Sequence, residues 1–193
     1  MSNLEEQEVA FSKTVFGFWI YLLTDFMLFG VLFAVYAVLK KNTFGGPSAE
    51  DLFALPPVLL QTVILLIGAF TIGLGSVMAH KGDVKRTILL YSATFLLGLV
   101  FMCLQFAEWH HLIASGNGWE KSAFLSAYFT LSGTFALHMV FALLWVIVLL
   151  IPVIKSGLTM VNLQRLVCLK MFWQFLNVIW VFIYTIVYLM GAF

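Results

Sequence analysis

Five long apolar segments constrain the fold of this chain more than any other feature of its sequence. Each has close to the ~20 residues that an α-helix needs to cross a bilayer, and each is far longer than a ~10-residue barrel strand. Of the 193 residues, 63% are hydrophobic and 10% are charged, whereas a soluble domain has about 25% charged residues. The sequence therefore predicts an all-α membrane protein with a bundle of five spans, at about 16–39, 56–79, 87–108, 125–151 and 170–191.

The spans form one predicted transmembrane domain, residues 16–193, which follows a cytoplasmic N-terminal segment at 1–15. That segment is acidic, and the first apolar run is too long for the core of a signal peptide, so we expect no cleavable signal. Prolines fit the first turn of a helix and disrupt its interior. They are expected at or beyond helix ends, with Pro47 in a loop, Pro56 and Pro57 opening the second span, and Pro152 closing the fourth.

Basic residues are distributed unequally over the two sides of the predicted bundle. Cytoplasmic flanks of membrane helices carry an excess of Lys and Arg. One side receives seven basic residues, namely Lys13, Lys81, Lys85, Arg86, Lys155, Arg165 and Lys170. The other side receives three, namely Lys40, Lys41 and Lys121. The bias predicts a cytoplasmic N-terminus and a periplasmic C-terminus, and the net charge of +1 gives no footprint for nucleic acid.

Small residues are concentrated in the second span. Ala69 and Gly73 stand four positions apart, as do Gly75 and Ala79. This spacing lets helix backbones approach each other closely in a membrane. Packing within the bundle is the favoured explanation, and contact with a partner subunit is the alternative.

Two ionisable residues, Asp25 and His138, are predicted at membrane depth. An ionisable side chain in hydrocarbon costs at least about 3 kcal/mol on insertion scales, so its presence usually indicates a function. The two lie at a similar predicted level, and Gln174 and Asn177 share one face of the fifth span. These four side chains are candidates for one buried polar cluster. Hydrogen bonding between helices is the favoured role, and proton handling or contact with a lipid headgroup is the alternative.

Further polar residues lie nearer the external side. Gln61 and Gln105 are candidates for a similar pair, and Glu108, His110 and His111 form a predicted interfacial cluster at the end of the third span. Adjacent histidines on a helix point about 100° apart, so they do not converge on one metal ion. A di-iron site needs many more His and carboxylate ligands than the chain offers. We therefore predict no catalytic, cofactor-binding or metal-binding residue in this chain.

Segments that cover nearly the whole chain carry a resemblance to a known family. They are residues 16–39, 45–62, 108–118 (EWHHLIASGNG), 124–140 and 157–193. In order, they resemble subunit III of the haem–copper oxidases, most closely the five-helix form of the ubiquinol-oxidising cytochrome o branch. The resemblance implies a multi-pass protein of the bacterial inner membrane that has no haem, copper or quinone site of its own.

The same resemblance implies partners. Subunit III packs directly against the catalytic subunit I, which holds the haems and copper, in a complex that also contains subunits II and IV. It holds membrane phospholipids in a cleft and helps to keep proton uptake and turnover stable. The complex oxidises ubiquinol, reduces oxygen to water and pumps protons.

Several positions depart from the family pattern. Four places where the family often has an ionisable residue hold amides here: Gln61, Gln105, Gln174 and Asn177. A paired histidine motif in the fourth span is reduced to Phe135 and His138, whereas Asp25 matches the family's acid in the first span. An amide keeps shape and hydrogen bonding but loses charge, so a proton-linked role is in doubt at these amides and a packing role is not.

Two other functions were weighed against an oxidase subunit. A small multi-spanning transporter or channel component would be expected to show repeat symmetry, broken helices or several midplane polar residues. A stand-alone membrane enzyme would need a nucleophile or a metal constellation. The sequence favours the non-catalytic third subunit of a proton-pumping ubiquinol oxidase.

Overall fold

The computed structural model describes residues 2–53 and 55–191, so Met1, Ala54, Ala192 and Phe193 of the predicted domains lie outside the described residues. All five predicted spans are helices long and apolar enough to cross a membrane, and the described residues contain no strand. The long helices are α1 (Ser2–Leu39), α3 (Leu55–His80), α4 (Val84–Ala114), α5 (Ala123–Ser156) and α6 (Met160–Ile183). A short helix, α2 (Ala49–Leu52), precedes α3, and a π-helix, η1 (Tyr184–Leu189), continues α6. The predicted fold class is confirmed.

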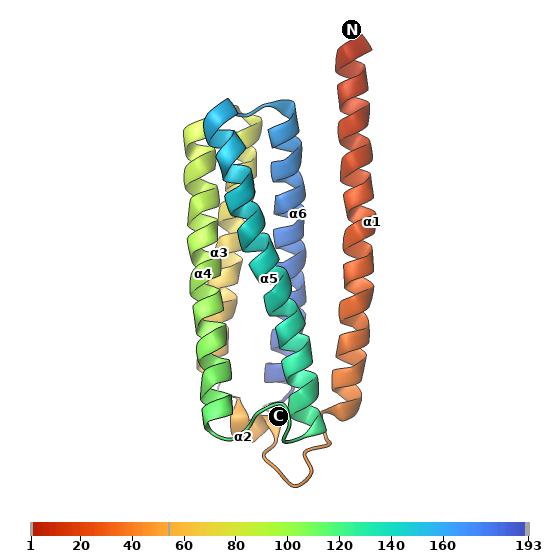
Figure 1. Cartoon of the computed structure of the whole chain (residues 1–193), viewed down its shortest axis with the longest axis vertical. Coiled ribbons are helices and arrows are strands. Elements are labelled where there is room, and N and C mark those ends of the chain that lie inside the picture. The colour runs from red at the N-terminus through yellow and green to blue at the C-terminus, as the bar shows by residue number, and fades with distance from the viewer. Residues whose placement is uncertain (1, 54, 192–193) are drawn as a thin grey trace.

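Helices α3 to α6 form a bundle, and α1 stands along one side of it (Figure 1). Helix α1 packs mainly against α5 and α6, and the start of α1 and the end of η1 lie at opposite ends of the molecule. The core between the bundle helices is rich in aromatic side chains. Trp173 and Trp180 of α6 are both fully buried within it.

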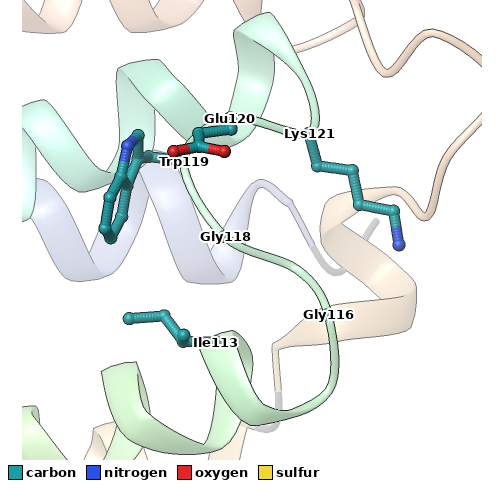
Figure 2. Close-up of a pocket in the computed structure, with 6 residues that line it drawn as sticks. All are labelled: Ile113, Gly116, Gly118, Trp119, Glu120 and Lys121. Atoms are coloured by element: carbon teal, nitrogen blue, oxygen red, sulfur yellow. The ribbon is translucent and has the colours of Figure 1, made fainter.

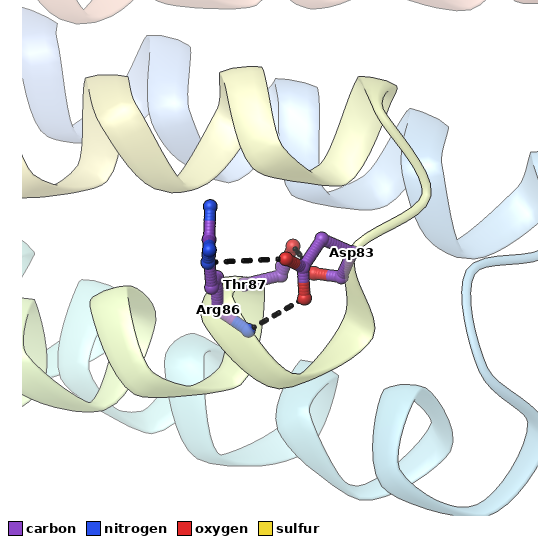
Figure 3. Close-up of polar contacts among 3 residues, drawn as sticks. All are labelled: Asp83, Arg86 and Thr87. Carbon is purple, nitrogen blue, oxygen red and sulfur yellow. Dashed lines mark hydrogen bonds and ion pairs between the residues drawn. The ribbon is translucent and has the colours of Figure 1, made fainter.

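Capping side chains fix where several helices begin. The Asp83 carboxylate accepts a hydrogen bond from the Arg86 backbone N–H at 3.1 Å and pairs with the Arg86 guanidinium at 3.3 Å (Figure 3). The Thr87 hydroxyl also donates to the Asp83 carbonyl oxygen at 2.7 Å. Ser122 and Thr159 cap α5 and α6 in the same way, each accepting from a backbone N–H three residues on.

Several helices extend beyond the predicted spans, including α1, which begins at Ser2 rather than at 16. The third span does not end at Glu108, because α4 continues for six residues to Ala114. The fourth does not close at Pro152, because α5 passes through it to Ser156 and ends at Gly157, whose φ is 70°. Membrane helices tolerate such a proline because neighbouring groups and local adjustments satisfy the freed carbonyl. The fifth span begins at Met160 rather than at 170, because the cap at Thr159 starts the helix before its apolar part.

Close packing between helices occurs at glycines other than Gly73. A Cβ added at Gly98 would lie 2.7 Å from the Trp173 ring, and one at Gly75 would lie 2.9 Å from the Tyr91 ring. At Gly73 an added Cβ would meet nothing within 4 Å. Packing within the bundle therefore accounts for Gly75 but not for Gly73.

Candidate functional site

The first buried polar site lies between α1 and α5. His138 Nε2 stands 3.9 Å from Asp25 Oδ2, within ion-pair range, and these side chains are only 16% and 12% exposed. His138 Nδ1 lies 2.8 Å from the Thr134 carbonyl oxygen. A carbonyl can only accept, so Nδ1 carries a hydrogen and Nε2 is the nitrogen left to face Asp25. A second hydrogen, at Nε2, would turn this contact into an ion pair.

Aromatic rings enclose this pair. The His138 ring centroid lies 5.2 Å from that of Phe29 and 6.4 Å from that of Phe172. A groove of about 380 Å³, lined in part by Tyr21, His138 and Phe141, opens beside it. The pair is therefore buried from one side and reachable through the groove from the other.

The structure brings together two of the four residues of the predicted cluster. Gln174 faces α3 instead, where its Nε2 donates to the Ala69 carbonyl oxygen at 3.0 Å. Asn177 has a buried Oδ1 without a hydrogen-bond partner among the described residues. Both amides lie on α6. Because Gln174 hydrogen-bonds the backbone of α3, it does not join Asp25 and His138, and the four residues do not form one cluster.

The second buried polar site centres on Glu108. Its Oε1 accepts from the Tyr188 hydroxyl at 2.9 Å and from the Tyr128 hydroxyl at 3.3 Å. Its Oε2 receives two longer and weaker contacts, from Gln61 Nε2 at 3.4 Å and Gln105 Nε2 at 3.5 Å. The two tyrosine hydroxyls also lie 2.9 Å apart. Four helical segments, α3, α4, α5 and η1, thus place polar groups on one carboxyl group.

This arrangement corrects two predictions. Gln61 and Gln105 converge on Glu108, and no hydrogen bond between the two amides is present in the part of the chain that the structure describes. Glu108 points into the bundle, whereas His110 and His111 are exposed. Successive residues of a helix point about 100° apart, so His110 is directed away from His111, whereas Glu108 and His111, three residues apart, line one groove.

Sequence reasoning missed Tyr128 and Tyr188. Both side chains are fully buried, yet a tyrosine in an apolar span has no charge that would single it out. The available signal was weak: Gln105 and Glu108 are three residues apart and share a helix face that needs partners.

A separate pocket, of about 450 Å³, lies at the loop between α4 and α5 (Figure 2). Ile113, Trp119 and Glu120 line it, and the Lys121 side chain extends away from Glu120. Lys121 Nζ instead donates to the Asn117 Oδ1 at 3.1 Å. Among residues 2–53 and 55–191, no three His, Cys, Asp or Glu side chains gather in a group that could hold a metal ion.

Five apolar spanning helices with two buried carboxyl groups define a multi-pass membrane protein. The sequence matches the family described as "Cytochrome c oxidase subunit III" over residues 6–192. The chain belongs to that family.

The sequence aligns with most of the length of its relatives. "Cytochrome bo(3) ubiquinol oxidase subunit 3" of Pseudomonas aeruginosa is 50% identical, over 93% of this chain and 86% of the relative. "Cytochrome c oxidase subunit 3" of Bacillus sp. (strain PS3) is 41% identical, over 91% and 84%. "Quinol oxidase subunit 3" of Bacillus subtilis is 36% identical, over 97% and 92%. These matches support an oxidase subunit and give no support to a transporter or channel component.

Proposed function

We propose that this chain is the non-catalytic subunit III of a proton-pumping terminal ubiquinol oxidase in an aerobic respiratory chain. The family match over residues 6–192 carries the proposal. The choice of ubiquinol rests on a relative named for ubiquinol that is 50% identical, against 41% for one named for cytochrome c. The haems and copper that oxidise ubiquinol and reduce oxygen then belong to the partner subunit I.

The proposed contribution of this chain is to stabilise subunit I and to bind lipid. Helix α1 is supported on one side by α5 and α6, and much of its remaining surface is exposed and apolar, including Phe16, Met27 and Val31. Such a surface fits the helices of subunits I, II and IV or the lipid between them. A Cβ added at Gly73 of α3 would meet nothing within 4 Å in this chain, so Gly73 is a candidate contact with a partner subunit.

The proposed placement is in a bacterial inner membrane with the N-terminus cytoplasmic. It assigns residues 1–15 to the cytoplasmic side and 16–193 to a single transmembrane domain with a periplasmic C-terminus. The bias of seven basic residues against three supports this orientation.

Purification of the tagged chain from its membrane in mild detergent tests the proposal. We expect it to copurify with a larger subunit and with a haem absorption spectrum. A colourless chain that is recovered alone, from membranes with active oxidase, would contradict the proposal.

A further inference from the structure

The pocket in the loop between α4 and α5 has no role in the function proposed above. Its volume is about 450 Å³, and its lining includes Ile113, Trp119 and Glu120. Figure 2 shows the Ile113 side chain on one side of the opening and Trp119 and Glu120 on the other. The pocket thus combines an aliphatic side chain, an aromatic ring and one carboxylate.

Backbone hydrogen bonds hold the first part of this loop in one shape. The Gly116 N–H donates to the Ile113 carbonyl oxygen at 3.0 Å, and the Asn117 N–H donates to the Leu112 carbonyl oxygen at 2.9 Å. Gly116 has a φ of 75°, in the left-handed region that glycine adopts without a steric cost. These bonds satisfy the last carbonyl groups of α4 and fix the direction in which the chain leaves the helix.

The second part of the loop is a turn that exposes Trp119 and Glu120. The Lys121 N–H donates to the Gly118 carbonyl oxygen at 3.2 Å, so Trp119 and Glu120 are the two central residues of the turn. The Trp119 ring is 54% exposed, yet its centroid lies 6.1 Å from that of Phe129 of α5, in an edge-to-face contact at 81°. This contact supports the ring, so the aromatic side of the pocket is formed in advance of any ligand.

Glu120 has no cationic partner among residues 2–53 and 55–191. The adjacent Lys121 side chain extends away from it (Figure 2) and donates to Asn117 Oδ1 at 3.1 Å. No Lys, Arg or His in this part of the chain lies within ion-pair distance of the Glu120 carboxylate. A guanidinium group can stack on an indole ring and donate two parallel N–H bonds to a carboxylate. The pocket therefore complements arginine better than it complements the compact ammonium of lysine.

The length of α4 places this pocket outside the hydrocarbon core. Helix α4 has 31 residues, so its end lies about 23 Å from its middle at 1.5 Å per residue. Half the thickness of the hydrocarbon core is about 15 Å, so the loop of a centred α4 lies about 8 Å beyond the core boundary. An extramembrane segment of a neighbouring protein can reach the pocket at this level.

We propose that this pocket binds an arginine side chain from an extramembrane segment of a partner subunit. The guanidinium lies against the Trp119 ring and donates to the Glu120 carboxylate, and the aliphatic part of the arginine contacts Ile113. Arginine and tryptophan are both enriched among the residues that dominate binding at protein interfaces. The inference rests on the proposed function for the presence of partner subunits, and it assigns a contact that the proposed function leaves open.

Photo-cross-linking in the assembled oxidase tests the contact, with the photoreactive amino acid benzoylphenylalanine in place of Trp119. We expect mass spectrometry to find a cross-link to another subunit, in an extramembrane segment and within a few residues of an arginine. Cross-links to lipid alone would make Trp119 an interfacial anchor and would overturn the inference. The absence of a cross-link to another subunit, or a cross-link to a segment without arginine, would also overturn it.

A dilution series of the assembled oxidase in one detergent, read by native mass spectrometry, measures how tightly the chain is retained. Glu120→Gln and Trp119→Leu are each expected to raise the midpoint concentration of dissociation about 2- to 5-fold. Glu50→Gln, at another exposed carboxylate on the same side of the bundle, is the matched control and should leave the midpoint unchanged. A midpoint that Glu120→Gln leaves unchanged, or that Glu50→Gln raises equally, would contradict the contact.

A double-substitution experiment separates a direct contact from a general loss of charge. Once the cross-linked arginine is replaced by glutamine, Glu120→Gln should have no further effect on the midpoint, whereas additive effects would refute the pairing. Failure of this inference is distinct from failure of the proposed function. A chain recovered without any partner contradicts the proposed function, and an intact oxidase without the cross-link contradicts the arginine contact alone.

Discussion

His138 holds its imidazole in one orientation through the 2.8 Å contact of Nδ1 with the Thr134 carbonyl oxygen, and this directs Nε2 towards Asp25. The pair joins α1 to α5. Polar contacts between membrane helices contribute about 0.6 kcal/mol on average and up to about 1.7 kcal/mol. The pair therefore stabilises the attachment of α1 to a modest extent.

Asp25→Asn is expected to weaken the attachment of α1 by about 0.6–2 kcal/mol, because the amide keeps the shape but removes the charge. The assembled complex should then lose activity faster during sustained turnover, while its initial rate of haem reduction by quinol stays at the wild-type value. Stopped-flow spectroscopy and long assays on the same preparation measure the two quantities. Immediate loss of haem reduction in a fully assembled variant would refute this expectation.

Glu108 offers a second prediction at the scale of single residues. Tyr188→Phe removes the 2.9 Å hydrogen bond to Glu108, and Tyr91→Phe removes a 3.2 Å bond from an equally buried tyrosine to the Leu166 carbonyl oxygen. Loss of a hydrogen bond to a charged group costs about 1.5–3 kcal/mol and to a neutral group about 0.5–1.5 kcal/mol. We expect the free energy of unfolding, measured by denaturant titration in detergent, to fall further for Tyr188→Phe. Equal losses would mean that Glu108 carries no charge.

The sequence predicted the helices better than any other feature of the structure. The number and type of the five spans followed from apolar length alone, but the ends of several helices did not. Hydropathy responds to composition, whereas a helix begins at a cap such as Thr159 and can continue past polar residues such as Glu108. Because the predicted third span ended at Glu108, the sequence did not indicate that this side chain points into the bundle.

The polar clusters were less predictable from the sequence than the helices, because their partners come from several helices. Asp25, His138 and Glu108 stand out as ionisable residues in or beside apolar spans. Their partners depend on which helix faces pack together, so the convergence of Tyr128 and Tyr188 on Glu108 requires the tertiary structure. The separation of Gln174 from Asp25 has the same cause, because α6 contacts both α1 and α3.

Helix packing predicts a contrast between two glycines. At Gly98 a Cβ would lie 2.7 Å from the buried Trp173 ring and 2.8 Å from Leu143, whereas at Gly73 it would meet nothing within 4 Å. Overpacking typically costs about 1–3 kcal/mol, so Gly98→Ala should lower the free energy of unfolding by that amount. Gly73→Ala is the matched control and should leave it within about 0.5 kcal/mol of the wild type. Equal effects of the two substitutions on unfolding in detergent would contradict the close packing of Gly98 against the Trp173 ring.

Over the whole molecule, α3 to α6 form a tightly packed unit with α1 along one side, and neither buried carboxyl group lies in a cluster of metal ligands within the described residues. This arrangement is compatible with the supporting role proposed above. Its outer surfaces, including the open face at Gly73, are then expected to be covered in the assembled oxidase.

Gly73→Leu tests that expectation for one surface. A Cβ added at Gly73 meets no neighbour within 4 Å in this chain, so we expect the isolated subunit to unfold as the wild type does. The yield of assembled complex should fall, because a bulky residue prevents close approach of a partner helix at a small-residue position. Unchanged yield and detergent stability of the complex would exclude Gly73 as a contact.

We propose above that this chain supports a terminal oxidase without taking part in its electron transfer. The most direct measurement compares the oxidase purified with and without this chain, by optical spectrum, initial rate of ubiquinol oxidation and decay of that rate. We expect the same haem content and initial rate for both preparations, with faster loss of activity when the chain is absent. If the oxidase without this chain lacks haem absorbance or the initial rate, the proposed supporting role is contradicted.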